Sequence, residues 1–212
     1  MRRLIPVLAF IIITFGLMAN NIYPSENLFS EIKPRNEIPF WITDVKEEGL
    51  APYRYINALV VKAVDGDTIK IDYKDNKYSV RLLCIDTPES ITQGVPTQSY
   101  AREASAFTKK LTLNQLVKLV FEKDVRDKYG RLLAHIILKN GDYLNALLVT
   151  NGFARVEIVS PNNSCSSYFY ELQDGAIRSS QGLWSLPRNK QPFVLNNNGV
   201  YVPVYWDVES AS

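Results

Sequence analysis

Three β-rich runs, separated by short turn-forming clusters, constrain the fold more than any other feature of this sequence. The runs cover residues 58–64, 68–73 and 78–85, and the clusters between them are Asp65-Gly66-Asp67 and Lys74-Asp75-Asn76. Asp, Gly and Asn are the residues that tight turns favour, so we expect these runs to form three consecutive antiparallel strands.

The elements that follow complete a small barrel. Apolar residues at three- and four-residue spacing predict a helix over 100–111, and residues 117–121 and 132–138 are expected to be strands. Two further helices are expected over 143–149 and 168–181, ended by Gly152 and Gly182. The fold class is therefore α+β and β-rich, a five-stranded OB-fold barrel with about three helices.

The two ends of the chain fall outside this barrel, which we assign to residues 58–187. Residues 1–19 have a basic start and a continuous apolar run, typical of a secretory signal peptide. The run is shorter than the about 20 residues of a spanning helix, but its arginine pair also suits a membrane anchor, so both alternatives stay open. Either way we expect the protein outside the cytoplasm, secreted or membrane-anchored.

Residues 20–57 show no sustained period and are interpreted as a linker or N-terminal extension. Residues 188–212 form a C-terminal tail, in which runs at 193–195 and 200–206 flank an Asn-Gly pair and resemble a hairpin.

Composition excludes several classes of protein. With 46% hydrophobic and 22% charged residues, a long disordered chain is excluded, and two cysteines are too few for a disulfide scaffold. A net charge of +2 does not by itself indicate nucleic acid, so a phosphate-binding claim depends on local residues. The single histidine, His135, lies mid-strand and is interpreted as structural, while Cys84 and Cys165 are expected to be free thiols.

Acids and arginines gather in three segments at the ends of the expected strands. They are Asp65-Gly66-Asp67-Thr68, the run from Arg81 through Asp86-Thr87-Pro88 to Glu89, and Asp127-Lys128-Tyr129-Gly130-Arg131. Each segment taken alone is also what a polar turn or a charged strand end contains.

Taken in order, these segments resemble staphylococcal nuclease, the thermonuclease family. Four further motifs appear in the same order: the run from Glu103 to Lys110, Asn145-Ala146-Leu147, Pro161-Asn162-Asn163 and Gly182-Leu183-Trp184-Ser185. The resemblance extends from about Ala58 to Trp184 and leaves out both ends of the chain.

The resemblance implies a role for each site residue. It implies a calcium ion held by Asp67, Asp86 and the backbone carbonyl of Thr87, and oxygen donors of this kind suit Ca²⁺. It implies that Glu89 activates the attacking water and that Arg81 and Arg131 clamp the scissile phosphate through their planar forks. It places Lys128 and Tyr129 near the terminal phosphate of a bound nucleotide.

The implied function is an exported, calcium-dependent endonuclease acting on DNA or RNA as a monomer, with 3′-phosphate products. A membrane is a partner only if residues 1–19 are retained. Two departures from the family predict weaker substrate capture: Val156–Ser160 lacks the family's tyrosines, and residues 90–99 lack its lysines. The alternative is a non-catalytic OB-fold module that binds single-stranded nucleic acid or a protein; the complete residue set argues against it.

Overall fold

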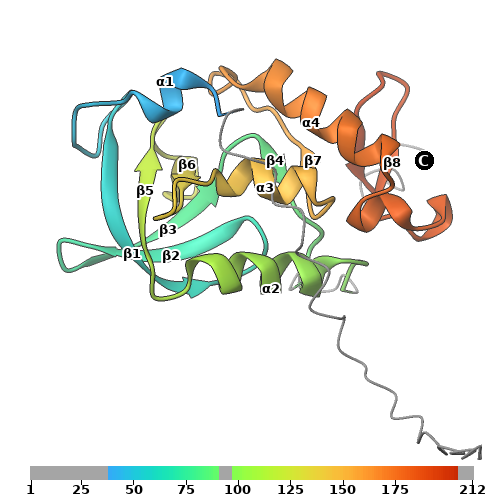
Figure 1. Ribbon diagram of the computed structural model, residues 1–212, viewed down its shortest axis with the longest axis horizontal. Coiled ribbons are helices and arrows are strands. Elements are labelled where there is room, and N and C mark those ends of the chain that lie inside the picture. The colour runs from blue at the N-terminus through green and yellow to red at the C-terminus, as the bar shows by residue number, and fades with distance from the viewer. Residues whose placement is uncertain (1–37, 91–96, 205–212) are drawn as a thin grey trace, which may run out of the picture. The chain divides into compact units, whose positions relative to one another are not determined.

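A computed structural model describes residues 38–90 and 97–204. Its centre is a closed five-stranded barrel with the strand order β1-β2-β3-β6-β5 (Figure 1). These strands are β1 (Tyr55–Ala63), β2 (Thr68–Tyr73), β3 (Asn76–Leu82), β5 (Leu116–Val120) and β6 (Leu132–Ile137). The predicted signal or anchor segment lies outside the described residues. Among those that are described, no helix has the length and apolar character to cross a bilayer.

The predicted three-strand meander is confirmed. β2 pairs antiparallel with both β1 and β3, and β5 closes the barrel by pairing with β1. The β3–β6 pair is parallel, with Val80 opposite Leu132. The β2–β3 register places Arg81 directly opposite Thr68, so the end of β3 lies beside the turn that precedes β2.

The predicted strand over 78–85 is in fact two strands joined by a turn. β3 ends at Leu82, and β4 (Ile85–Asp86) pairs instead with β7 (Arg155–Val156). Between them Cys84 has a φ of 67°, in the left-handed region. The Asn145 side chain donates to the carbonyl of Leu83 at 2.9 Å and stabilises this break. An apolar run shows no change of period at such a turn, so the sequence pattern does not reveal it.

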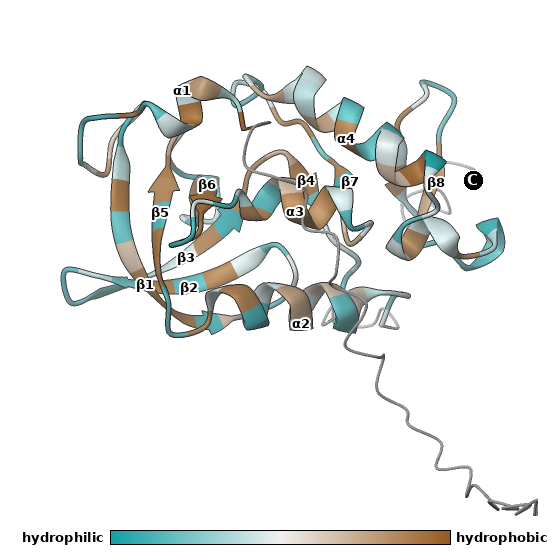
Figure 2. Cartoon of the chain, in the orientation of Figure 1, coloured by the Kyte–Doolittle hydropathy of each residue, from teal (hydrophilic) through white to brown (hydrophobic). Residues whose placement is uncertain are grey.

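The three predicted helices are present, and a short fourth helix precedes the barrel. They are α1 (Phe40–Thr43), α2 (Ala101–Thr112), α3 (Leu144–Thr150) and α4 (Ser166–Arg178). α2 packs on β1 and α3, and α3 packs on β6 and α4 (Figure 1). Buried and exposed residues alternate from Ile56 to Val60 of β1, as a strand with one buried face requires. The colours of Figure 2 show that this strand carries both hydrophobic and hydrophilic residues.

The tail predicted to resemble a hairpin does form one. β8 (Phe193–Leu195) pairs antiparallel with β9 (Tyr201–Pro203), and two 3-10 helices, Gly182–Ser185 and Arg188–Lys190, connect α4 to it. Phe193 is buried against Trp184, and the rings of Trp184 and Tyr201 lie 4.7 Å apart. The hairpin is therefore packed on the end of α4 rather than detached.

Two glycines allow the segments that follow α3 and α4 to touch. Gly152 and Gly182 both have positive φ, and the Leu183 amide donates to the Gly152 carbonyl at 2.8 Å. A Cβ on Gly152 would lie 2.1 Å from the carbonyl oxygen of Gln181. Gly152 follows the end of α3 as predicted, but the prediction that Gly182 ends the next helix is wrong. α4 already ends at Arg178, with Ser180 in the left-handed region, and Gly182 begins a 3-10 helix. Both glycines are required for the close backbone contact.

We predict that Gly152→Ala lowers the free energy of unfolding by about 3 kcal/mol or more, because it adds a backbone clash to left-handed strain. Gly130→Ala is the matched control: Gly130 has a φ of 79° and open space around its α-carbon, so only strain of about 1 to 2 kcal/mol applies. Urea unfolding of both variants measures the difference, and equal losses would contradict the close approach.

Candidate active site

Arg81 lies at the centre of a cluster of carboxylates at the end of β3. Its Nη1 contacts Asp67, and its Nη2 lies 3.0 Å from Asp86 and 3.2 Å from Glu157. Burial alone would lower the pKa of Arg81, but these carboxylates raise it above its ordinary value. The guanidinium is therefore charged and held in one orientation.

The predicted metal residues Asp67 and Asp86 contact this guanidinium, and the third, Thr87, bonds to Asp67. One oxygen of Asp67 accepts from both the amide of Thr87, at 2.7 Å, and its hydroxyl, at 3.0 Å. The other oxygen accepts from the Thr68 hydroxyl at 3.1 Å. These bonds join the turn before β2 to the chain that leaves β4.

Gly66 allows that turn to approach so closely. A Cβ at this position would lie 2.7 Å from the Thr87 side chain and 2.8 Å from the Cβ of Ala104. The hydroxyl of Thr108, from the buried face of α2, donates to the Gly66 carbonyl. The sequence offered Gly66 only as a turn former, and the space it provides is visible only in the structure.

The cluster carries more negative charge than its arginines compensate. Burial, with the neighbouring Asp67 carboxylate, raises the pKa of Asp65 to about 7. Burial likewise raises the pKa of Asp86 to about 7, although Arg81 opposes the shift. Crowded carboxylates with oxygen donors are the environment that a hard divalent cation relieves, so these residues fit calcium.

Arg155 and Glu157 also belong to this cluster, and sequence reasoning missed both. Arg155 is 5% exposed; its Nε donates to Asp86 at 2.9 Å and its Nη2 to Glu157 at 2.7 Å. Arg155 and Glu157 are two residues apart in the sequence, and residues at this spacing share a face of an extended strand. This spacing was the one feature of the sequence that could have predicted the pair. That signal has meaning only once β7 is known to pair with β4.

A cleft of about 490 Å³ brings the predicted phosphate-binding residues together. Arg81, Arg131, Lys128 and Tyr129 all line it, and so does Glu157. Arg131 is oriented by an Nε bond of 2.7 Å to Asp127, whose other oxygen accepts the amides of Tyr129 and Arg131. The Tyr129 side chain is 73% exposed, which leaves its ring available to a ligand.

Glu89 lies on the chain that follows the metal residues. Its amide donates to the side chain of Gln98 at 2.8 Å, and its carbonyl accepts from the Gln98 amide at 3.0 Å. Its negative charge makes a small contribution to the raised pKa of Asp65, after burial and the Asp67 carboxylate. Its catalytic role stays a prediction.

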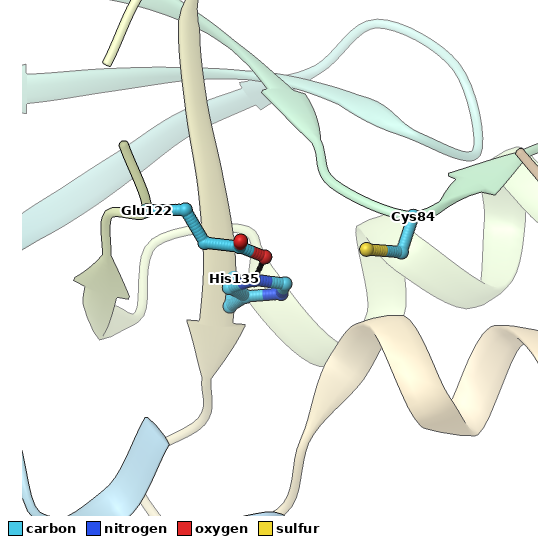
Figure 3. Close-up of side chains that lie close together, drawn as sticks. All are labelled: Cys84, Glu122 and His135. Atoms are coloured by element: carbon cyan, nitrogen blue, oxygen red, sulfur yellow. Dashed lines mark hydrogen bonds and ion pairs between the residues drawn. The ribbon is translucent and has the colours of Figure 1, made fainter. Parts of the chain in front are cut away.

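A second group of potential metal ligands, Cys84, Glu122 and His135, lies inside the protein (Figure 3). His135 Nε2 lies 2.8 Å from Glu122, its Nδ1 contacts the Tyr143 hydroxyl, and Glu122 also accepts from the Ser164 hydroxyl at 2.7 Å. Burial raises the pKa of the Cys84 thiol, which is therefore neutral. Both ring nitrogens of His135 and both carboxylate oxygens of Glu122 have protein partners, and the sulfur and nitrogen donors do not suit calcium. We interpret the group as a structural network.

That network predicts a specific pH dependence of stability. Burial lowers the pKa of His135 below its ordinary 6.5, and the bond to Glu122 only partly offsets the shift. Below pH 6.5 the unfolded chain gains a proton that the folded chain does not, so stability falls as the pH falls. Relative to His135→Gln, the unfolding free energy of the wild type is expected to drop by up to about 1.4 kcal/mol per pH unit. Urea unfolding between pH 7.5 and 5.5 measures this, and parallel curves would contradict it.

Comparison with known proteins finds one matching family model and several similar nucleases. The family model described as staphylococcal nuclease homologue matches residues 79–186. The chain is 34% identical over 140 residues to a thermonuclease of Staphylococcus hyicus, covering 66% of this chain and 82% of the relative. It is 37% identical over 126 residues to a thermonuclease of Staphylococcus intermedius, covering 59% and 74%. It is also 37% identical over 134 residues to endonuclease YncB of Bacillus subtilis, covering 62% and 63%.

Proposed function

This chain belongs to the staphylococcal nuclease family, and from that premise we propose that it is an exported, calcium-dependent nuclease that hydrolyses phosphodiester bonds of DNA or RNA. Relatives named thermonuclease and endonuclease support nuclease activity. One observation carries the proposal: Arg81 contacts two of the predicted metal carboxylates and lines the same cleft as Arg131. Metal and phosphate would therefore meet at one guanidinium.

The proposed metal site consists of Asp67, Asp86 and the backbone carbonyl of Thr87. The three carboxylates in contact with Arg81 support this assignment, because they outnumber the two arginines of the cluster. Burial raises the pKa of Asp65 and of Asp86 to about 7, and the Asp67 carboxylate adds to both shifts. A calcium ion bound there would supply positive charge to the phosphate and acidify a nearby water. Export is consistent with calcium, since weak calcium sites are filled only where the ion is near millimolar concentration.

The arginines would stabilise charge that develops on the phosphate. Asp67 and Asp86 fix the orientation of Arg81, and Asp127 fixes that of Arg131, so neither guanidinium needs to be ordered during the reaction. Donors held in place in this way typically contribute about 3 kcal/mol each to transition-state stabilisation.

Glu89 would accept a proton from the attacking water. The new bond forms between the water oxygen and phosphorus, and the bond from phosphorus to the 5′ oxygen breaks. The 5′ oxygen takes up a proton from solvent and leaves as a 5′-hydroxyl, and the other product ends in a 3′-phosphate. No covalent intermediate is required, and the family resemblance implies this direct attack. General bases of this kind typically contribute about 10²- to 10⁴-fold in rate.

The first test is cleavage of labelled single-stranded DNA and RNA with calcium and with chelator. Glu89→Gln is expected to lower turnover by about 10²-fold or more while calcium-dependent binding is kept. Glu171→Gln is the control with the same charge change, because Glu171 is exposed on α4 and does not line the cleft. Near-normal turnover in Glu89→Gln would remove this residue from the mechanism, and binding without cutting by the wild type would indicate a recognition module.

Arg131→Lys tests the geometry of the clamp. Lysine keeps the charge but loses the planar fork that binds two phosphate oxygens, so we expect about 10-fold or greater loss of kcat/KM. Steady-state kinetics on a dinucleotide measure the loss. A normal rate in this variant would show that positive charge alone is sufficient at position 131.

A further inference from the structure

Glu157 bridges the two arginines of the acidic cluster. One carboxylate oxygen lies 3.2 Å from Nη2 of Arg81, and the other lies 2.7 Å from Nη2 of Arg155. The Glu157 side chain is 36% exposed, whereas those of Arg81 and Arg155 are 13% and 6% exposed. The bridge therefore joins two enclosed cations through an anion that solvent can reach.

Glu157 is the accessible partner of Arg81. The guanidinium has three carboxylate neighbours, and the side chains of Asp67 and Asp86 are only 8% and 12% exposed. Glu157 lines the cleft together with Arg81, and these two carboxylates do not. A phosphate oxygen that enters from the cleft thus reaches Nη2 of Arg81, the donor that contacts Glu157. Of the carboxylates in contact with Arg81, Glu157 is the one that this phosphate can displace.

Arg155 gives the displaced carboxylate a fixed partner. Its Nη1 donates to the carbonyl of Tyr201 at 2.9 Å, and its guanidinium carbon lies 5.4 Å from the centre of the Phe193 ring. Both strands of the C-terminal hairpin therefore hold Arg155, in addition to its bond with Asp86. Glu157 has the shorter contact with this arginine, so losing Arg81 leaves it paired rather than uncompensated.

We propose that Glu157 competes with the substrate phosphate for the Arg81 guanidinium. The Glu157 carboxylate thereby sets how strongly the cleft binds an anionic phosphodiester. A phosphodiester oxyanion takes its place on Arg81 while Glu157 stays bound to Arg155, so each binding event replaces one anion with another at the same donor. The inference rests on the proposed function in one respect, that Arg81 binds the substrate phosphate. The inference also gives the C-terminal hairpin a role in the site, because contacts with Tyr201 and Phe193 of the hairpin position Arg155.

The test is calorimetric binding of a dinucleotide without terminal phosphates, in the presence of calcium. All variants carry Glu89→Gln, which the proposed function expects to slow cutting during the titration. Adding Glu157→Gln is expected to tighten binding about 5- to 10-fold, because a charge beside the phosphate is removed. Adding Glu171→Gln, an exposed change of the same charge, is expected to leave binding unchanged.

Arg155→Gln separates competition from a structural effect. Without Arg155, Glu157 is paired with Arg81 alone and is harder to displace, so binding of the dinucleotide is expected to weaken severalfold. Adding Glu157→Gln to the Arg155→Gln chain is expected to restore this affinity. A purely structural role of Arg155 predicts no restoration, which would overturn the proposal.

A dinucleotide with an uncharged methylphosphonate linkage identifies the group that Glu157 opposes. Its affinity is expected to be the same with and without Glu157→Gln, and an equal gain for both ligands would overturn the proposal. If the phosphodiester binds but Glu157→Gln does not tighten it, the inference fails and the proposed function survives. If no variant binds the phosphodiester, both fail.

Discussion

The ion-pair cluster around Arg81 is the interaction on which the rest of the site depends. Its partners come from separate parts of the chain: Asp67 from the turn before β2, Asp86 from β4 and Glu157 from the position after β7. The barrel register brings the turn to Arg81, and the break after β3 turns Asp86 toward it. A buried guanidinium is costly without such partners, so the positions of these segments and the geometry of the site depend on one another.

This arrangement has an electrostatic cost. Burial raises the pKa of Asp65 and of Asp86 to about 7, and the negative charge of Asp67 adds to both shifts. Arg155 compensates part of this charge, and a bound cation would compensate more. By contrast, the polar network around His135 has a partner for each group and needs no ligand. The same small barrel therefore holds a buried polar network whose groups are hydrogen-bonded and a site with an excess of negative charge.

Sequence reasoning recovered the fold and most of the candidate site. The helix predicted over 100–111 is α2 at Ala101–Thr112, and the strand predicted over 68–73 is β2 with the same bounds. Four residues carried over from the family line the cleft, namely Arg81, Lys128, Tyr129 and Arg131. Asp67 and Asp86 contact Arg81, and Thr87 bonds to Asp67. The catalytic role of Glu89 stays a prediction. Arg155 and Glu157 were missed because β7 has only two residues, too few for any periodic pattern.

By itself, the sequence determined the local elements and the chemistry available to them. Turn formers and alternating apolar residues specify strands through short-range sterics and burial, and the ordered motifs specify the family. Only the tertiary structure decided which charges meet. The turn at Cys84, the β4–β7 pair and the hairpin that holds Arg155 all depend on contacts between residues far apart in the chain. Ion pairs depend on distance in space, which sequence spacing does not encode.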